Sequence, residues 1–312
     1  MEADPGVFLI GVGVRSPWYM GMTTRDLDKV FGDERMIDIP ISENAITGIG
    51  IGGAMAGMRP IVNHPRMDFM YLAMDPIFNH ASTAHYMFGG KVSVPVTIRG
   101  VINRGGEQST QHSQALQAMF AHVPGLKVVM PSTAYDAKGL LMAAVRDDGP
   151  VIYIDDRWLY DDECDVPEEA FEVEIGKGVV RVSGNDLTAV AISYPAGLAC
   201  KAAARLAKEG VSVEVIDPRT LKPLDIDLIR SSVQKTGRLL VIDGAWRTCG
   251  MAGEICAQVC EDPATFRALK APVQRLTLPD CHAPASAVLE EAYYIDESKV
   301  ENAIREILGC PV

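Results

Sequence analysis

Motifs that mark several common enzyme classes are missing from this 312-residue sequence. No G-x-S-x-G segment occurs, which argues against a serine hydrolase, and the seven cysteines include no C-x-x-C pair. A disulfide framework or zinc set is therefore not indicated, and we expect Cys256 and Cys260 to pack in the interior on one helical face. The Gly11-Val-Gly13 segment lacks the third glycine of a dinucleotide-binding fingerprint.

Positive charge and long apolar runs are also scarce. Twenty-nine basic residues against 41 acidic residues give a net charge of −12, which argues against nucleic acid as a main partner. The uncharged run 44–58 is shorter than the ~18–20 apolar residues that a membrane helix needs. The acidic start, Met-Glu-Ala-Asp, does not resemble a signal peptide. We expect a cytoplasmic protein with neither a membrane nor a nucleic-acid partner.

Alternating strand and helix patterns predict an α/β protein with two domains, each built on a mostly parallel sheet covered by helices. We expect a first domain over residues 1–160, an acidic linker over 161–180 and a second domain over 181–312. The expected strands are 7–10, 61–62, 94–98, 127–130, 151–154, 187–192, 213–216 and 238–242. The expected helices are 24–31, the segment after Glu43, 74–86, 113–120, 136–146, 197–209, 226–235, 252–260 and 298–308.

Glu43 stands directly before the uncharged run 44–58, in which five residues are glycine and three are alanine. A carboxyl group at the start of such a close-packing segment is expected to be buried. Burial without a cationic partner favours the protonated form, which can share its proton with a heterocyclic ligand. The structural alternative is a helix start at which Ser42 caps the helix and Glu43 complements the helix dipole.

Two further residues stand where a plain α/β scaffold would not require them. His112 lies in a polar, glycine-containing loop that follows a strand, so it is expected near the carboxyl-terminal edge of the sheet, where open α/β folds bind ligands. Phe69 is an aromatic residue just before a helix. Taken singly, His112 could be polar surface and Phe69 could be core.

Together these segments resemble the beta subunit of the thiamine-diphosphate-dependent 2-oxoacid dehydrogenase decarboxylase component, a group that includes pyruvate, branched-chain and acetoin dehydrogenase beta subunits. The resemblance covers nearly the whole chain and rests on an ordered set of segments. These are 37–43 (Ile-Asp-Ile-Pro-Ile-Ser-Glu), 54–60, 86–90, 111–114 (Gln-His-Ser-Gln), 121–131 and 136–141 in the first domain, and 217–224 and 232–238 in the second.

The resemblance implies a transketolase-like pyrimidine-binding domain followed by a transketolase C-terminal-like domain. In it, Glu43 hydrogen-bonds a ring nitrogen of the cofactor aminopyrimidine and thereby activates the thiazolium carbon. Phe69 stacks on the pyrimidine, with Met67 beside it in the cofactor site, and His112 faces the reacting carbon. The turn at Asp147 matches the place where family members can hold a monovalent cation such as K⁺.

The superfamily's Gly-Asp-Gly segment, which begins the diphosphate and Mg²⁺ site, does not occur in this chain. The sequence therefore predicts half of a thiamine diphosphate site. The resemblance implies an alpha subunit that supplies the other half and holds Mg²⁺. We expect a homodimer of this chain within a heterotetramer, with a lipoyl acyltransferase as a further partner.

Departures from the family pattern leave the acyl acceptor open. Asn63 to Arg66 stand where an acid and aromatic residues are common, and the loop before His112 carries Asn103, Arg104 and Glu107. The leading hypothesis is a half-enzyme that decarboxylates a small 2-oxo acid and transfers the acyl or aldehyde unit. The alternatives are a carboligase or transketolase-like half-enzyme with a carbonyl acceptor, and a non-catalytic stabilising subunit.

Overall fold

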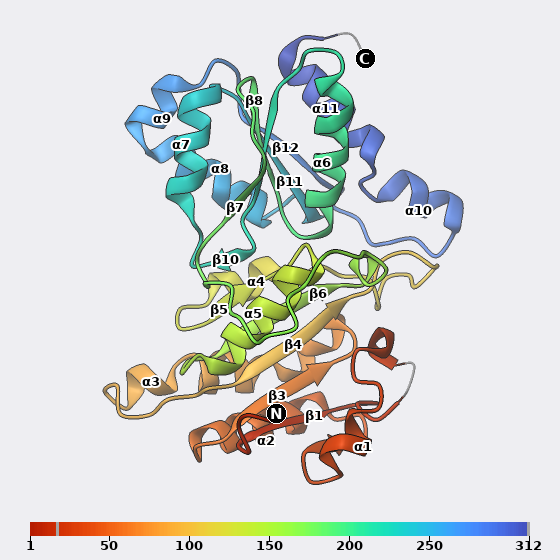
Figure 1. The fold of residues 1–312 in the computed structure, drawn as a ribbon, viewed down its shortest axis with the longest axis vertical. Helices are drawn as coiled ribbons and strands as arrows, with labels where there is room; N and C mark the ends of the chain where they lie inside the picture. Colours follow the sequence, from red (N-terminus) through yellow and green to blue (C-terminus); the bar gives the residue numbers. More distant parts are fainter. Residues whose placement is uncertain (17–18, 311–312) are drawn as a thin grey trace. The chain divides into compact units, whose positions relative to one another are not determined.

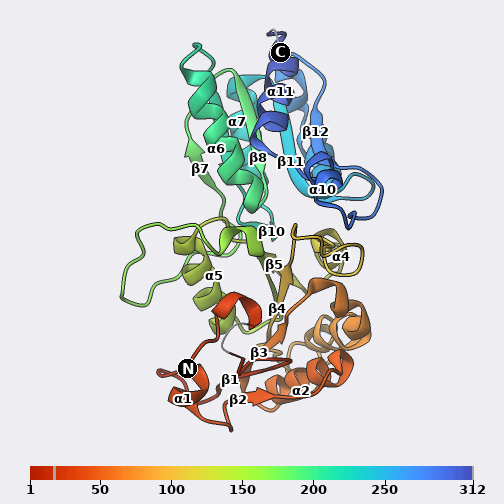
Figure 2. The same cartoon turned by 90° about the vertical axis from the view of Figure 1, so that its right-hand side faces the viewer.

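The computed structural model describes residues 1–16 and 19–310, which divide into two compact units (Figures 1 and 2). Unit 1 comprises residues 1–104 and 111–175, and unit 2 comprises residues 105–110 and 176–312. Within the described part of the chain, no helix is both long enough and apolar enough to cross a membrane.

Unit 1 contains a parallel sheet whose strands run in the order β5-β6-β4-β3-β1-β2. The strands are β1 (Val7–Gly11), β2 (Met36–Asp38), β3 (Arg59–His64), β4 (Thr97–Ile102), β5 (Lys127–Val129) and β6 (Val151–Asp156). All residues of β1, β4 and β6 are buried, as expected for parallel strands covered on both faces.

The helices of unit 1 cover both faces of this sheet, with α5 on one face and α2 on the other (Figure 2). The helical segments are η1 (Tyr19–Met22), α1 (Leu27–Phe31), α2 (Glu43–Met55), η2 (Met67–Ala73), η3 (Pro76–Ala81), α3 (Ala84–Met87), α4 (Gln117–His122), α5 (Ala134–Arg146) and η4 (Arg157–Leu159). Of these, η1, η2 and η4 are 3₁₀ helices and η3 is a π-helix.

Two glycines allow α2 and η2 to pack closely on the unit 1 sheet. A Cβ atom on Gly50 would lie 2.3 Å from Cγ2 of Val62, so the glycine lets α2 approach β3. A Cβ atom on Gly100 would lie 2.5 Å from Sδ of Met70, so η2 packs directly on β4. Glycine at these positions therefore sets how closely both segments approach the strands.

Unit 2 contains a sheet of order β12-β11-β8-β9-β7, parallel except where β7 pairs with β9. Helices α6 and α11 lie on one face, and α7 and α8 on the other (Figure 1). The elements are β7 (Val179–Val182), β8 (Leu187–Ala191), α6 (Tyr194–Ala207), β9 (Val213–Asp217), β10 (Thr220–Lys222), α7 (Ile226–Thr236), β11 (Leu239–Trp246), α8 (Met251–Glu261), α9 (Pro263–Ala268), β12 (Gln274–Leu278), α10 (Ala287–Tyr293) and α11 (Glu297–Leu308).

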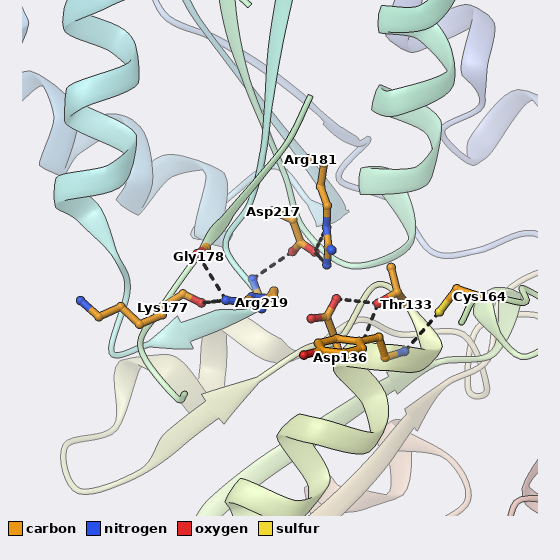
Figure 3. Close-up of polar contacts among 9 residues, drawn as sticks. Thr133, Asp136, Cys164, Lys177, Gly178, Arg181, Asp217 and Arg219 are labelled. Carbon is orange, nitrogen blue, oxygen red and sulfur yellow. Dashed lines mark hydrogen bonds and ion pairs between the residues drawn. The ribbon is translucent and has the colours of Figure 1, made fainter. Parts of the chain in front are cut away.

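Side-chain hydrogen bonds fix turns and helix starts in both units (Figure 3). In unit 2, the carboxylate of Asp217 accepts hydrogen bonds from Arg181 at 2.7 Å and from the backbone N–H of Arg219 at 2.9 Å. In unit 1, Thr133 caps α5 by accepting from the backbone N–H of Asp136 at 3.1 Å, and its hydroxyl donates to the Asp136 carboxylate at 2.6 Å. Such reciprocal pairs specify where a helix begins.

The fold class agrees with the sequence prediction, whereas two predicted helices differ. Residues 74–86 were expected to form one helix, but Pro76, which has no backbone N–H, begins a separate π-helical segment. Residues 113–116 are not helical, because the N–H groups of Gln114 and Leu116 donate to side chains of η2. The sequence analysis also missed the short strands β2, β7, β10 and β12 and the helices α9 and α10.

Candidate functional site

Glu43 is the first residue of α2 and its side chain is buried, with 6% of the residue exposed. The hydroxyl of Ser42 donates to the carbonyl of Pro40 at 3.0 Å and does not cap the helix. Asn44 donates from Nδ2 to the carbonyl of Leu72 at 3.3 Å, which fastens the start of α2 to the end of η2. The Ser42 cap of the structural alternative is therefore absent, whereas Glu43 does stand in the first turn of α2, where a carboxylate complements the helix dipole.

Phe69 and His112 face each other. Their ring centroids are 5.4 Å apart and the ring planes meet at 89°, the edge-to-face geometry that aromatic pairs favour. Phe69 belongs to η2 after β3, and His112 lies in the turn after β4. Glu43 follows β2, so the structure places all three residues beyond the carboxyl ends of parallel strands, where ligands bind in open α/β sheets.

Three contacts join η2 to the segment that carries His112. Asp68 accepts at Oδ1 from the backbone N–H of Gln114 at 3.2 Å, and Tyr71 donates to Oε1 of Gln114 at 3.1 Å. The backbone N–H of Leu116 lies 3.4 Å from Sδ of Met67. Met67, which was expected beside the pyrimidine, is completely buried. The sequence analysis missed Asp68 and Tyr71, whereas Gln114 lies in the segment 111–114 on which the family resemblance partly rests.

Burial shifts the pKa values of several polar groups around this site. Burial raises the pKa of the Asp68 carboxyl, although the hydrogen bond from Gln114 and the charge of His112 oppose the rise. Burial and the charge of Asp68 raise the pKa of Tyr71. Under α2, Nε2 of His64 lies 3.1 Å from the Thr47 hydroxyl, and burial lowers the pKa of His64 to about 4. His64 is therefore a neutral core residue at physiological pH.

The loop before His112 is held at several points. Arg104 forms a buried ion pair with Asp156 at 2.7 Å, and Asn103 accepts from Arg157 at 2.7 Å. Within unit 2, both carboxylate oxygens of Glu290 lie 3.1 Å from the backbone N–H of Glu107. The Glu107 carboxylate in turn accepts from the N–H of Ala287, the first residue of α10, at 3.3 Å. Asn103, Arg104 and Glu107, which depart from the family pattern, thus all contact other residues of this chain.

Two other sequence-predicted positions lie apart from the site. Asn63 is on the sheet face opposite α2, because side chains alternate along β3 and Val62 and His64 face α2. Asp147 follows the C-terminus of α5, at the amino-terminal edge of the sheet. Its carboxylate pairs with Lys127, and its carbonyl accepts from Arg59 at 3.0 Å.

The residues present suit the pyrimidine half of a thiamine cofactor. Glu43 provides a buried carboxyl group and Phe69 provides a partly exposed ring at the same sheet edge. Residues 1–16 and 19–310 include no cluster of three or more His, Cys, Asp or Glu side chains that could hold a metal ion. Glu43 and Phe69 thus offer the hydrogen-bonding and stacking groups that an aminopyrimidine ring takes.

Comparison with known proteins defines the class. Residues 1–162 match the transketolase pyrimidine-binding domain, and residues 176–300 match the transketolase C-terminal domain. A solved structure described as a split gene transketolase, inactive beta4 tetramer, has a TM-score of 0.80 at 22% identity and covers 99% of this chain and 93% of that chain. This likeness supports the two-domain α/β fold. The chain is thus built from the domains of transketolase-type enzymes.

Curated relatives narrow the class further. The acetoin:2,6-dichlorophenolindophenol oxidoreductase subunit beta of Cupriavidus necator is 41% identical over 99% of this chain and 93% of that protein. Its counterpart from Bacillus subtilis is 40% identical, over 100% of this chain and 94% of the relative. The mitochondrial pyruvate dehydrogenase E1 component subunit beta of Bos taurus is 41% identical over 99% and 87%. The chain belongs to this family of beta subunits, which confirms the resemblance inferred from sequence.

Proposed function

We propose that this chain is the beta half of a thiamine-diphosphate-dependent enzyme that decarboxylates a small 2-oxo acid and transfers the resulting acyl or aldehyde unit. The convergence of Glu43, Phe69 and His112 at one sheet edge carries this proposal. The family relationship supports the reaction class and the need for an alpha subunit. Retention of all three residues argues against a merely stabilising subunit.

The bound cofactor would supply a carbon nucleophile that adds to the 2-oxo group and accepts the electron pair released with CO₂. Glu43 shares a proton with a pyrimidine nitrogen, and its burial keeps water from competing for this hydrogen bond. Phe69 packs against the pyrimidine, and Met67 supports Phe69 from the interior. His112 orients the reacting group and moves a proton there, as a general acid or base.

The alpha subunit supplies the diphosphate and Mg²⁺ ligands that this chain lacks, and two copies of each subunit form a heterotetramer. The outward face of α2 supports a close subunit contact. Gly48 and Gly52 have open space before them, and Ile49 and Met55 are exposed. Further exposed apolar side chains lie on α3, where Tyr86 is 90% and Met87 is 70% exposed. Large exposed apolar groups of this kind mark protein interfaces.

Two finer points belong to the same proposal. A monovalent cation such as K⁺ at the Asp147 turn would have to displace Arg59, which donates to the carbonyls of Val145 and Asp147, because Lys127 already pairs with the Asp147 carboxylate. A cytoplasmic location is supported by the seven cysteines, all of which lie in the described part of the chain and are unpaired.

The acceptor is proposed to be a lipoyl group on an acyltransferase. The sequence-based argument for a carbonyl acceptor rested partly on Arg104 and Glu107, and both side chains make internal contacts. Their presence therefore gives no support to a carboligase. An assay compares the lipoyl acceptor with the carbonyl acceptor. The assembled enzyme is given a 2-oxo acid together with either a lipoylated domain or a series of aldehydes. Carboligation without lipoyl acylation would replace our proposal with the carboligase.

Calorimetry tests the half-site directly. Thiamine diphosphate is titrated, with and without Mg²⁺, into the purified chain and into its complex with the cognate alpha subunit. We expect tight, Mg²⁺-dependent binding only in the complex, because the chain alone offers pyrimidine contacts but no diphosphate ligands. Tight Mg²⁺-dependent binding by the isolated chain would contradict the proposal, as would a complex that binds no cofactor.

A further inference from the structure

Unit 1 contains a cavity that the proposed function does not use. It has a volume of about 350 Å³ and is lined mainly by the first turns of α5, by the end of β6 with residues that follow it, and by Arg99 of β4. Gly100 faces η2, so the neighbouring side chain of Arg99 projects from the opposite face of the sheet. The sheet therefore lies between this cavity and the segment that carries Phe69. The size of the cavity and its place near the carboxyl edge of the sheet are typical of ligand sites in α/β folds.

On its sheet side, the cavity has a buried ion pair with balanced charges. Oδ2 of Asp155 accepts hydrogen bonds from the Arg99 guanidinium and from the Tyr160 hydroxyl, the latter at 3.2 Å. Nη1 of Arg99 donates to the hydroxyl of Thr23 at 2.9 Å. The apolar part of the lining consists of Pro131, Ala134, Ala137, Leu141 and Leu159. Polar groups on one side and apolar groups around them suit a small ligand with one polar end.

The hydrogen-bond donors around the cavity are engaged within the chain. The Thr133 hydroxyl donates to a carboxylate of α5 at 2.6 Å, and the Tyr153 hydroxyl donates to a backbone carbonyl of α5 at 3.0 Å. The Lys138 ammonium donates to a backbone carbonyl of the linker at 2.9 Å. Acceptors remain, because within the described residues Asp155 accepts only at Oδ2 and the exposed carboxylate of Asp162 has no side-chain partner. A ligand must therefore supply the hydrogen-bond donor.

The start of α5 does not offer an anion site, although helix N-termini often bind anions. The N–H of Tyr135 donates to Sγ of Cys164 at 3.4 Å, and that of Asp136 donates to Oγ1 of Thr133 at 3.1 Å (Figure 3). The carboxylate of Asp136 adds negative charge to the first turn. Because the guanidinium on the sheet side is already paired, a ligand anion would gain little from it.

We infer that this cavity binds a small amphipathic amine. Its ammonium group is held by Asp155 and Asp162, and its apolar part packs against Ala137, Leu141 and Leu159. An ammonium group provides three donors and a positive charge, which match the acceptors that the two carboxylates offer. An alcohol of the same shape provides one donor and no charge, and an ionised acid provides no donor. Both are therefore expected to bind more weakly than the amine. This inference does not depend on the reaction proposed above.

The test compares three probes with the same branched carbon skeleton: isobutylamine, isobutanol and isobutyrate. Saturation-transfer NMR on the assembled enzyme gives a dissociation constant for each probe and needs no turnover. Ala137→Leu fills the cavity with an apolar side chain, and Asp162→Asn removes the exposed carboxylate with little change of shape. Asp161→Asn is the matched control, because Asp161 is also exposed but is not among the described residues that line the cavity. Thermal melts check that each variant is folded.

We expect saturable binding of isobutylamine and at least ~10-fold weaker binding of isobutanol, because a hydroxyl forms a weaker hydrogen bond to a carboxylate than an ammonium group does. Ala137→Leu should abolish the binding of isobutylamine. Asp162→Asn should weaken it about 3-fold, the scale of an exposed ion pair, and Asp161→Asn should leave it unchanged. The comparison of Asp162→Asn with Asp161→Asn decides the question even if Ala137→Leu does not fold. The inference is overturned by the absence of saturable isobutylamine binding, by tighter binding of isobutyrate in the same cavity, or by amine binding that Ala137→Leu and Asp162→Asn leave unchanged.

Discussion

Both units contain buried polar pairs, but most of the buried side-chain polar atoms without a partner among the described residues belong to unit 1. In unit 2, the buried hydroxyl of Thr188 lies 2.7 Å from that of Ser232 and 2.8 Å from that of Thr236, and Lys235 pairs with buried Glu214. In unit 1, buried side-chain atoms without a partner among the described residues include those of Asn63, Thr97 and Ser113 and Oδ2 of Asp68. The paired groups support a scaffold, whereas unpaired groups lower stability and are retained where they serve another purpose.

Helix starts with and without a side-chain cap occur in both units, and Thr133 caps α5 in unit 1. In unit 2, α7, α9 and α11 begin at Asp225, Asp262 and Asp296, each of which accepts a backbone hydrogen bond at the cap. In unit 1, the side chain of Ser42 does not cap α2, and neither does that of Arg66 before η2. Within unit 1, the segments that carry Glu43 and Phe69 thus begin without the side-chain cap that Thr133 provides for α5.

The largest expected effect comes from comparing two buried glutamates, Glu43 of unit 1 and Glu214 of unit 2. Glu43→Gln should slow hydrogen–deuterium exchange at the reactive cofactor carbon by ~10³-fold, because the amide cannot share the proton, while cofactor binding persists. The matched variant, Glu214→Gln, should leave exchange intact and lower the melting temperature, because it breaks the pair with Lys235. Unchanged exchange in Glu43→Gln would show that Glu43 does not activate the cofactor carbon.

The next effect concerns the loss of stability at acid pH, part of which should come from buried His64 of unit 1. Its pKa is about 4 in the folded state and 6.5 unfolded, so the unfolded chain takes up the proton first as pH falls. The contribution of His64 to the free energy of unfolding is therefore fully present above pH 6.5. It falls by about 3 kcal/mol between pH 6.5 and pH 4. Denaturant unfolding at several pH values should show a weaker decline in His64→Gln, whereas exposed His80→Gln should resemble the parent. Equal slopes in all three proteins would show that His64 is not buried neutral.

Threonine-to-valine exchanges compare the units at nearly constant volume. Thr188→Val should lower the free energy of unfolding by about 1–3 kcal/mol, because it deprives Ser232 and Thr236 of a buried partner. Thr97→Val should be neutral or stabilising, because the buried Thr97 hydroxyl has no partner within the described residues. Denaturant titrations measure both. Equal losses would mean that the two hydroxyls are equally well bonded.

The smallest expected effect on stability concerns the residues at helix N-termini. Asp225→Ala should cost about 1 kcal/mol, because Asp225 accepts from the N–H of Leu228 at 3.4 Å and from that of Gly178 at 3.1 Å. Ser42→Ala should change stability by only a few tenths of a kcal/mol, because the Ser42 hydroxyl does not cap α2. Thermal melts of both variants provide the check. A larger loss from Ser42→Ala would reverse the contrast.

The regular parts of the fold could be predicted because their signals are local. The buried strand Leu187–Ala191 and the helix Ile226–Thr236, ended by Gly237, lie close to their expected ranges. Of the site, Glu43 and His112 could be found from their sequence surroundings and the family resemblance. The link from Asp68 to Gln114 could not, because it joins residues 46 positions apart and replaces a helical turn that the local pattern favoured.

The docking of the loop 105–110 within unit 2 limits how this gene can be divided. The chain leaves unit 1 after Arg104, places Glu107 against α10, and returns just before His112. A fragment that starts at residue 176 would leave the buried Glu290 carboxylate without the N–H of Glu107, and the first N–H of α10 without the Glu107 carboxylate. Shuffling the C-terminal unit between relatives therefore requires transferring six residues from the middle of the N-terminal half as well.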